Sequence, residues 1–126
     1  MEFLVSAALA IVGGIHLLPL TGIRGSAALT RLYGVPIDEK NLEILMRHRA
    51  VLFGMLGALL VYAAFVPEVR TIAFIAGFLS VVSFLALAGA AGGVNAKIRQ
   101  VVITDVIALV ILVIGVIAHT WMTFAP

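Results

Sequence analysis

The sequence predicts an all-α protein, an integral membrane four-helix bundle with both termini on the non-cytoplasmic side. Of its 126 residues, 63% are hydrophobic and 11% are charged, whereas soluble domains are about 45–50% apolar and about 25% charged. Four apolar stretches are each close to the roughly 20 residues that a helix needs to cross a membrane. Lysine and arginine gather on one side of these stretches, which indicates the orientation.

The four predicted spans fill most of the chain, so we expect a single domain over residues 1–126 without an appended soluble domain. The first stretch has the length of a secretory signal. It carries Glu2 where such a signal has basic residues, so we expect it to remain as a span. The predicted spans cover about residues 3–23, 50–66, 71–94 and 101–123.

The longest polar segment, residues 24–49, joins the first span to the second. We expect Ser26 to cap a short amphipathic helix that ends at Tyr33, because Gly34 follows and favours a turn. Asp38 is the expected N-cap of a helix that continues into the second span. The beginning of that helix must therefore lie at the membrane surface.

A much shorter segment, VPEVR (residues 66–70), joins the second span to the third. Proline lacks a backbone N–H group and cannot continue a helix, so Pro67 is expected to end the second span. Glu68 and Arg70 are expected to mark the boundary with water. The second and third spans therefore form a helical hairpin.

The distribution of lysine and arginine predicts which loops are cytoplasmic. Of the eight such residues, only Arg70 lies in the hairpin between the second and third spans. Because cytoplasmic loops carry an excess of Lys and Arg, we expect the other two loops to be cytoplasmic. Tyr62, His119 and Trp121 lie near the opposite boundary, where aromatic side chains anchor helices. The seven cytoplasmic residues are Arg24, Arg31, Lys40, Arg47, Arg49, Lys97 and Arg99.

Two ionisable residues, His16 and Asp105, lie within predicted spans. A charge there costs at least about 2.5–3.5 kcal/mol at a helix centre, so each residue needs a partner or a function. At about 1.5 Å per residue, both lie roughly 6–10 Å inside the cytoplasmic face of the membrane. His48 and Arg49 approach this depth from the second span. We therefore expect these four side chains to form one polar cluster.

Small residues share helix faces with the members of this cluster. Gly13 lies beside His16, and Gly54 and Gly57 follow Arg47 on its face of the second span. Small side chains let helix backbones approach closely. The polar faces are therefore expected to contact other helices.

Four further residues belong to the expected site. Glu43 and Arg47 form its second layer, and their spacing of four residues also predicts an ion pair. Tyr33 and Asn95, on the two cytoplasmic loops, either close a polar pocket or only shape the turns. A structural role also remains open for the basic residues, which can anchor a helix at lipid headgroups.

The two residues inside the spans also have a structural alternative. His16 can be a core histidine that is bonded to a backbone carbonyl or to Asp105. An isolated carboxylate at this depth would become protonated or pair with Arg47, Arg49 or His16.

Several kinds of chemistry have no support in the sequence. Cysteine is absent, which excludes thiolate metal sites and cysteine nucleophiles from this chain. Motifs for zinc proteolysis, phosphate-binding loops and the serine hydrolase elbow are also absent. We expect no metal and no cofactor, with bis-histidine haem ligation by His16 and His48 as an alternative. The net charge of +2 gives no basis for nucleic-acid binding.

A carboxyl group, histidines and arginines in an apolar bundle suit a lipid-soluble substrate. His or Asp can exchange protons with it, and a guanidinium can hold an oxyanion. Our hypothesis is a site for an isoprenoid-, steroid- or quinone-like molecule and, if the protein is an enzyme, isomerisation, hydration or ring opening. The candidate catalytic residues are His16, His48 and Asp105. The candidate substrate-binding residues are Arg49, Arg47, Glu43, Tyr33 and Asn95.

A second hypothesis is a non-catalytic accessory or structural subunit of a larger membrane complex. The same polar residues would then dock a partner and hold the helices in register. The glycine-rich faces could equally join copies of the chain in a homo-oligomer.

The segments VGGIHLLP (residues 12–19) and LMRHRAVLFGMLGALL (residues 45–60) resemble small bacterial membrane proteins grouped as DoxX-like. The resemblance covers the whole chain and implies a four-helix bundle in the bacterial inner membrane; some such proteins are regarded as partners of oxidoreductases. More distantly, the layout is similar to four-helix sterol-isomerase-like proteins, from which no catalytic role is carried over. The most specific DoxX-like pattern is formed by Arg49, Ala50, Gly54 and Gly57.

Overall fold

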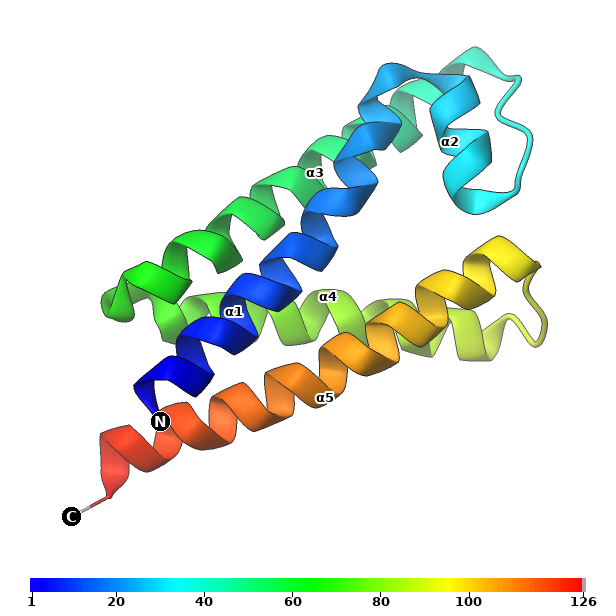
Figure 1. Cartoon of the computed structure of the whole chain (residues 1–126). Coiled ribbons are helices and arrows are strands. Elements are labelled where there is room, and N and C mark those ends of the chain that lie inside the picture. Colours follow the sequence, from blue (N-terminus) through cyan, green and yellow to red (C-terminus); the bar gives the residue numbers. More distant parts are fainter. Residues whose placement is uncertain (126) are drawn as a thin grey trace.

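The computed structural model describes residues 1–125, and within this range the chain is a bundle of helices without a strand (Figure 1). The predicted all-α fold is therefore confirmed. In chain order the elements are α1 (Glu2–Leu17), the 3-10 helix η1 (Leu18–Arg24), α2 (Ser26–Tyr33), α3 (Lys40–Phe65), the 3-10 helix η2 (Pro67–Val69), α4 (Arg70–Ala90) and α5 (Ala96–Phe124).

Four helical segments are long and apolar enough to cross a membrane. They are Glu2–Arg24, Lys40–Phe65, Pro67–Ala90 and Ala96–Phe124. Each contains most of one predicted span, and the second and fourth extend well beyond the apolar stretch on the polar side. The third ends earlier than predicted, because Gly92 turns the chain with a φ of 77°. This is the architecture of a multi-pass helical membrane protein.

The predicted N-cap of α3 is wrong by one residue. Glu39, not Asp38, holds this position. Its two carboxylate oxygens accept hydrogen bonds from the backbone N–H groups of Asn41 and Leu42, at 2.9 and 2.8 Å. The longer glutamate side chain therefore satisfies two of the four N–H groups that the start of a helix leaves without a partner.

The predicted N-cap of α2 is also wrong. Ser26 is the first residue of the helix, and Gly25 precedes it with a φ of 126°, a conformation that favours glycine. The end of α2 is as predicted, since Gly34 adopts the left-handed conformation with a φ of 64°. Two glycines thus delimit this short helix.

Figure 1 shows both termini and the α3–α4 turn at one end of the bundle, and α2 at the other end. Helix α1 packs against both α3 and α5, while α4 packs against α5 and α3. The core lies along these contacts. Its larger buried side chains are Val5, Leu9, Val12, Leu60, Phe74, Val81 and Leu112.

Helices α1 and α3 approach each other closely at two facing glycines. A Cβ atom on Gly57 would lie 2.9 Å from the carbonyl oxygen of Gly13, and one on Gly13 would lie 2.9 Å from the backbone nitrogen of Val61. No side chain fits in so little space. The close contact predicted from the small residues on the second span is confirmed.

The prediction that Arg70 marks the boundary with water is wrong. The residue is buried, with 3% of its surface exposed. Its guanidinium forms an ion pair of 2.7 Å with Glu2 and donates a hydrogen bond of 3.0 Å to the hydroxyl of Ser6. It also donates bonds of 3.2 Å to the carbonyl oxygens of Ala63 and Ala64. The last carbonyls of a helix lack intrahelical partners, and the tight turn brings Arg70 to those of α3.

Candidate functional site

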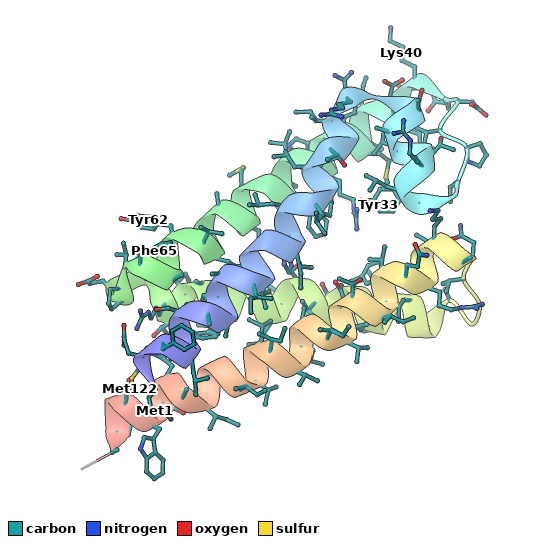
Figure 2. All side chains as sticks on the ribbon, viewed as in Figure 1. Met1, Tyr33, Lys40, Tyr62, Phe65 and Met122 are labelled. Carbon is teal, nitrogen blue, oxygen red and sulfur yellow. The ribbon has the colours of Figure 1, made fainter. Side chains whose placement is uncertain are left out.

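A cavity of about 250 Å³ lies at the end of the bundle that carries α2. All five α-helices and η1 contribute to its lining. Tyr33, labelled in Figure 2, lies on α2, which contacts both η1 and α5. The polar lining residues are His16, Tyr33, Arg49, Lys97, Gln100, Thr104 and Asp105. Four of the eight residues predicted for the site, namely His16, Tyr33, Arg49 and Asp105, therefore line one cavity.

The imidazole of His16 is held in one orientation at the wall of the cavity. Only 2% of the residue is exposed, and its ring stacks on Phe53 with a centroid distance of 5.8 Å. Nδ1 lies 2.9 Å from the carbonyl oxygen of Val12, and Nε2 lies 3.2 Å from the hydroxyl of Ser80. Because a carbonyl only accepts, Nδ1 must carry the proton. In the neutral ring, Nε2 is therefore the acceptor and can act as a base.

Arg49 is fixed between two aromatic rings. Its guanidinium carbon lies 4.5 Å from the ring centre of Phe53 and 5.2 Å from that of Tyr33. Nη1 donates a hydrogen bond of 2.6 Å to the hydroxyl oxygen of Tyr33. Both rings attract the cation through their negative faces. This arrangement links α2 to α3 and holds a positive charge at the cavity.

Asp105 is half-buried on α5 and lines the same cavity. Among residues 1–125 there are two ion pairs, and Asp105 takes part in neither. It forms no hydrogen bond with those residues, and no polar side-chain atom that is fully buried lacks a partner. Its carboxyl oxygens are therefore not fully buried, and the residue lines the cavity. Of the two predicted alternatives, protonation or pairing with Arg47, Arg49 or His16, the pairing does not occur.

The rest of the lining is largely apolar. It includes two flat aromatic side chains, Phe53 of α3 and Phe84 of α4. Leu18 of η1 both lines the cavity and has 63% of its surface exposed on the outside of the bundle. The cavity therefore combines a few polar groups with apolar walls, which is the usual composition of a small-molecule site.

Three predicted site residues lie outside this cavity. His48 is exposed on α3 and does not line the cavity. Arg47 is also exposed, and donates a hydrogen bond of 2.8 Å to the carbonyl oxygen of Ile23. The predicted ion pair of Arg47 with Glu43 is confirmed at 3.7 Å. The bond from Arg47 to Ile23 therefore joins α3 to η1 at the polar end of the bundle.

Asn95 also lies outside the cavity but connects two elements that line it. Its side-chain oxygen accepts a hydrogen bond of 2.8 Å from the backbone N–H group of Ile98 and so caps α5. Its side-chain nitrogen donates to the carbonyl oxygens of Tyr33 and Gly34, at 2.9 and 3.3 Å. Asn95 thus fastens the end of α2 to the start of α5.

A larger cavity of about 760 Å³ lies between α4 and α5 and reaches towards the end with the termini. His119, predicted as an interfacial anchor, lines this cavity. Its Nε2 lies 3.3 Å from the hydroxyl oxygen of Thr71. This cavity gathers no carboxyl group and no guanidinium. It is therefore a weaker candidate for proton chemistry than the cavity with Asp105.

Sequence reasoning missed Ser80, Phe53 and Thr104 as parts of the site. Phe53 follows Arg49 by four residues and so shares its helix face, a signal that could have identified it. Thr104 precedes Asp105 directly. Nothing distinguishes Ser80 from the other serines in the sequence, because its importance comes from the packing of α4 against His16.

The residues that the structure describes hold no group of three His, Asp or Glu side chains that could bind a metal ion. Haem ligation by His16 and His48 has no geometric support either. His16 is buried against Ser80, whereas His48 is exposed outside the cavity.

No protein-family model matches the chain, and no curated protein or solved structure shows significant similarity to it. The resemblance to the DoxX-like proteins therefore remains a prediction. Function must be inferred from the chemistry of the cavity.

Proposed function

We propose that the protein binds the polar head of a small lipophilic molecule in the cavity lined by His16, Arg49 and Asp105, and that His16 and Asp105 exchange protons with it. One observation carries this proposal. A single space of about 250 Å³ combines apolar walls with an imidazole, a guanidinium and a carboxyl group from three different helices. The molecule would be isoprenoid-, steroid- or quinone-like.

The absence of an ion pair between Arg49 and Asp105 supports binding rather than a structural role. Ionisable side chains within membrane spans normally pair with one another. Arg49 instead bonds to Tyr33, and Asp105 has no partner among residues 1–125. Two polar groups that share a cavity without satisfying each other are suited to an external molecule.

Proton transfer is the chemistry that these groups support best. Nε2 of neutral His16 has a lone pair, which now accepts from Ser80 at 3.2 Å. Asp105 can take up or release a proton on another wall of the cavity. The donors of Arg49 can stabilise negative charge that develops on a substrate oxygen. An isomerase, a hydratase or a ring-opening enzyme would use such a set.

Location and orientation belong to the same proposal. Seven of the eight lysine and arginine residues fall in the two polar parts of the chain between the first and second and between the third and fourth predicted spans. Helix α2 lies in the first of these parts. By the positive-inside rule the end of the bundle that carries α2 faces the cytoplasm, and both termini face the other side. The resemblance to DoxX-like proteins favours the bacterial inner membrane.

The proposal is tested by the small molecules that co-purify with the protein. Thr104→Trp would fill the cavity, whereas Ser83→Trp adds the same side chain to the larger cavity between α4 and α5. The parent and both variants are purified in mild detergent, checked for helix content by circular dichroism, and extracted for mass spectrometry. We expect a discrete non-phospholipid compound in the parent and in Ser83→Trp, and its loss from Thr104→Trp.

Two results would contradict the proposal. One is bulk phospholipid alone in all three preparations. The other is a compound that Thr104→Trp retains in full. A protein partner that co-purifies in stoichiometric amount would instead favour the accessory-subunit hypothesis.

A further inference from the structure

We infer that the molecule bound in this cavity carries an uncharged head with a hydrogen-bond acceptor next to a hydrogen-bond donor, and that this head bridges Arg49 and Asp105. A primary amide and a hydroxyketone are heads of this class. The inference rests on the proposed function and narrows it to one chemical class of ligand.

The requirement for an acceptor comes from Arg49. A guanidinium has five N–H donors and no acceptor. The structure gives one hydrogen bond of Arg49 with residues 1–125, the bond to Tyr33. Phe53 and Tyr33 lie over the guanidinium, at 4.5 and 5.2 Å. The remaining N–H donors of Arg49 lie in the plane of the guanidinium and point outward from its edges. A group that satisfies them must therefore offer an oxygen or nitrogen lone pair in the plane of the guanidinium.

The requirement for a donor comes from Asp105. An ionised carboxylate only accepts hydrogen bonds, and within residues 1–125 no group donates to Asp105. A carboxyl group in an apolar space is costly unless it finds a partner. A ligand O–H or N–H group beside the acceptor that binds Arg49 would supply this partner.

The charges in the cavity favour an uncharged head. Arg49 lines the same cavity as Asp105, and a nearby opposite charge favours the ionised form of a carboxyl group. The two charges then balance each other, while Lys97 is exposed. An anionic head would leave the carboxylate of Asp105 facing a like charge between apolar walls. A cationic head would face Arg49 in the same way. A neutral head that lies between Arg49 and an ionised Asp105 places no like charge beside either of them.

The size of the cavity indicates that only the head is enclosed. Its volume of about 250 Å³ is below the about 300–1,000 Å³ of pockets that enclose a drug-sized molecule. Leu18 lines the cavity and is 63% exposed on the outside of the bundle. An apolar tail can therefore leave past Leu18 into the surrounding lipid. The aromatic walls formed by Phe53 and Phe84 suit a flat head.

Three fluorescent probes with the same ring test the inference on the purified full-length protein. 2-Naphthamide has a carbonyl next to an N–H donor, N,N-dimethyl-2-naphthamide keeps the carbonyl but has no donor, and 2-naphthoate is an anion. A hydrogen bond to a charged group lowers the dissociation constant about tenfold or more. We therefore expect 2-naphthamide to bind at least about tenfold more tightly than the other two probes.

Matched variants separate the two contacts. Asp105→Leu should abolish the preference for 2-naphthamide and leave the affinity for the dimethylamide unchanged. Since Asp105 has no partner to lose, this variant should fold. Arg49→Met should weaken both amides. Ser83→Leu, in the larger cavity, should change neither affinity.

The outcomes distinguish this inference from the proposed function. One outcome is that the two amides bind the parent equally and that neither binds the Thr104→Trp variant. This would overturn the inference and leave the proposed function standing. Tightest binding of 2-naphthoate would likewise overturn it, in favour of an anion site. If no probe bound saturably, the inference would fail, and the co-purified compound would decide the proposed function separately.

Discussion

Arg70, the first residue of α4, forms an ion pair of 2.7 Å with Glu2, the first residue of α1. The same guanidinium donates to the carbonyl oxygens of Ala63 and Ala64 near the end of α3. One buried side chain therefore joins three helix ends, at the opposite end of the bundle from the polar cavity. This contact holds together the frame on which the cavity is built.

Arg70→Met is expected to destabilise the protein. The substitution keeps most of the apolar bulk but leaves the carbonyls of Ala63 and Ala64 without the donors of Arg70. Ser6 still donates to the carbonyl oxygen of Ala64 at 2.7 Å, so the carbonyl of Ala63 is the group left without a side-chain donor. An unsatisfied buried group costs about 1–3 kcal/mol, and the free energy of unfolding should fall by about this amount. Unfolding by SDS, followed by circular dichroism, measures the change.

Glu2→Gln is the matched control for this prediction. Glu2 is exposed, and glutamine keeps a side-chain oxygen that can still accept a hydrogen bond from the buried guanidinium of Arg70. This variant should therefore affect stability less than Arg70→Met. Similar losses in the two variants would mean that the ion pair, not the bonds to the carbonyls, holds the helix ends together.

Gly57→Ala is expected to separate α1 from α3. The new Cβ atom would lie 2.9 Å from the carbonyl oxygen of Gly13 and 2.8 Å from the side chain of Leu17. Since a backbone atom cannot move aside alone, the substitution should cost about 1–3 kcal/mol of overpacking. The control is Gly14→Ala on α1, next to Gly13. Its new Cβ atom meets no atom within 4 Å, so the variant should be neutral or stabilising by up to about 1 kcal/mol. Equal stability of both variants in thermal unfolding would disprove the close contact.

Much of the fold could be predicted because the physics of a membrane is simple. Apolar stretches of the right length must be helices, and the spacing of small residues identified the contact at Gly57. Depth along each span also predicted that His16, Arg49 and Asp105 lie at one level. All three line the same cavity.

Depth could not predict which way each side chain faces. His48 and Arg49 are neighbours in sequence, but successive residues of a helix point about 100° apart, and only Arg49 faces the cavity. Arg70 was misjudged for a related reason. Its burial depends on the tight η2 turn, which places it beside the end of α3 and the start of α1, a long-range arrangement that no local pattern reveals.

Glu39 predicts a pH dependence of stability at the start of α3. The backbone N–H groups of Asn41 and Leu42 bond to its carboxylate and hold the pKa of Glu39 below its ordinary value of 4.5. The folded state thus favours the ionised form, whose stabilisation is complete above pH 4.5 and is lost as the pH falls through the lowered pKa. The difference in thermal midpoint between the parent and Glu39→Gln should therefore be largest at pH 7 and shrink below about pH 4. If the difference in thermal midpoint stayed constant across this pH range, the ionised carboxylate of Glu39 could not be the cause of the difference in stability.

The absence of cysteine allows a direct test of the proposed orientation. Glu68→Cys places one thiol in the α3–α4 turn, and Arg31→Cys places one on α2; both positions are exposed. In intact bacterial cells, a membrane-impermeant maleimide should label the first variant and label the second only after permeabilisation. The reverse pattern would invert the bundle and place the polar cavity on the outer side.

Tyr33→Phe tests whether the orientation of Arg49 matters for binding. The substitution keeps the ring over the guanidinium and the packing of Tyr33 with Leu29 and Ile37, but removes the hydroxyl that accepts from Nη1 at 2.6 Å. The freed guanidinium can then turn towards Asp105, and an ion pair between them would occupy both groups. We expect the affinity for 2-naphthamide to fall about tenfold, with the stability of the bundle nearly unchanged.

The control for this prediction is Tyr33→Leu, which loses the ring as well as the hydroxyl. It should weaken probe binding at least as much and, because α2 packs through Tyr33, also lower stability. If Tyr33→Phe bound 2-naphthamide as tightly as the parent, the bond from Arg49 to the hydroxyl would have no part in positioning the guanidinium. The aromatic contacts alone, at 4.5 and 5.2 Å, would then have to hold Arg49 apart from Asp105.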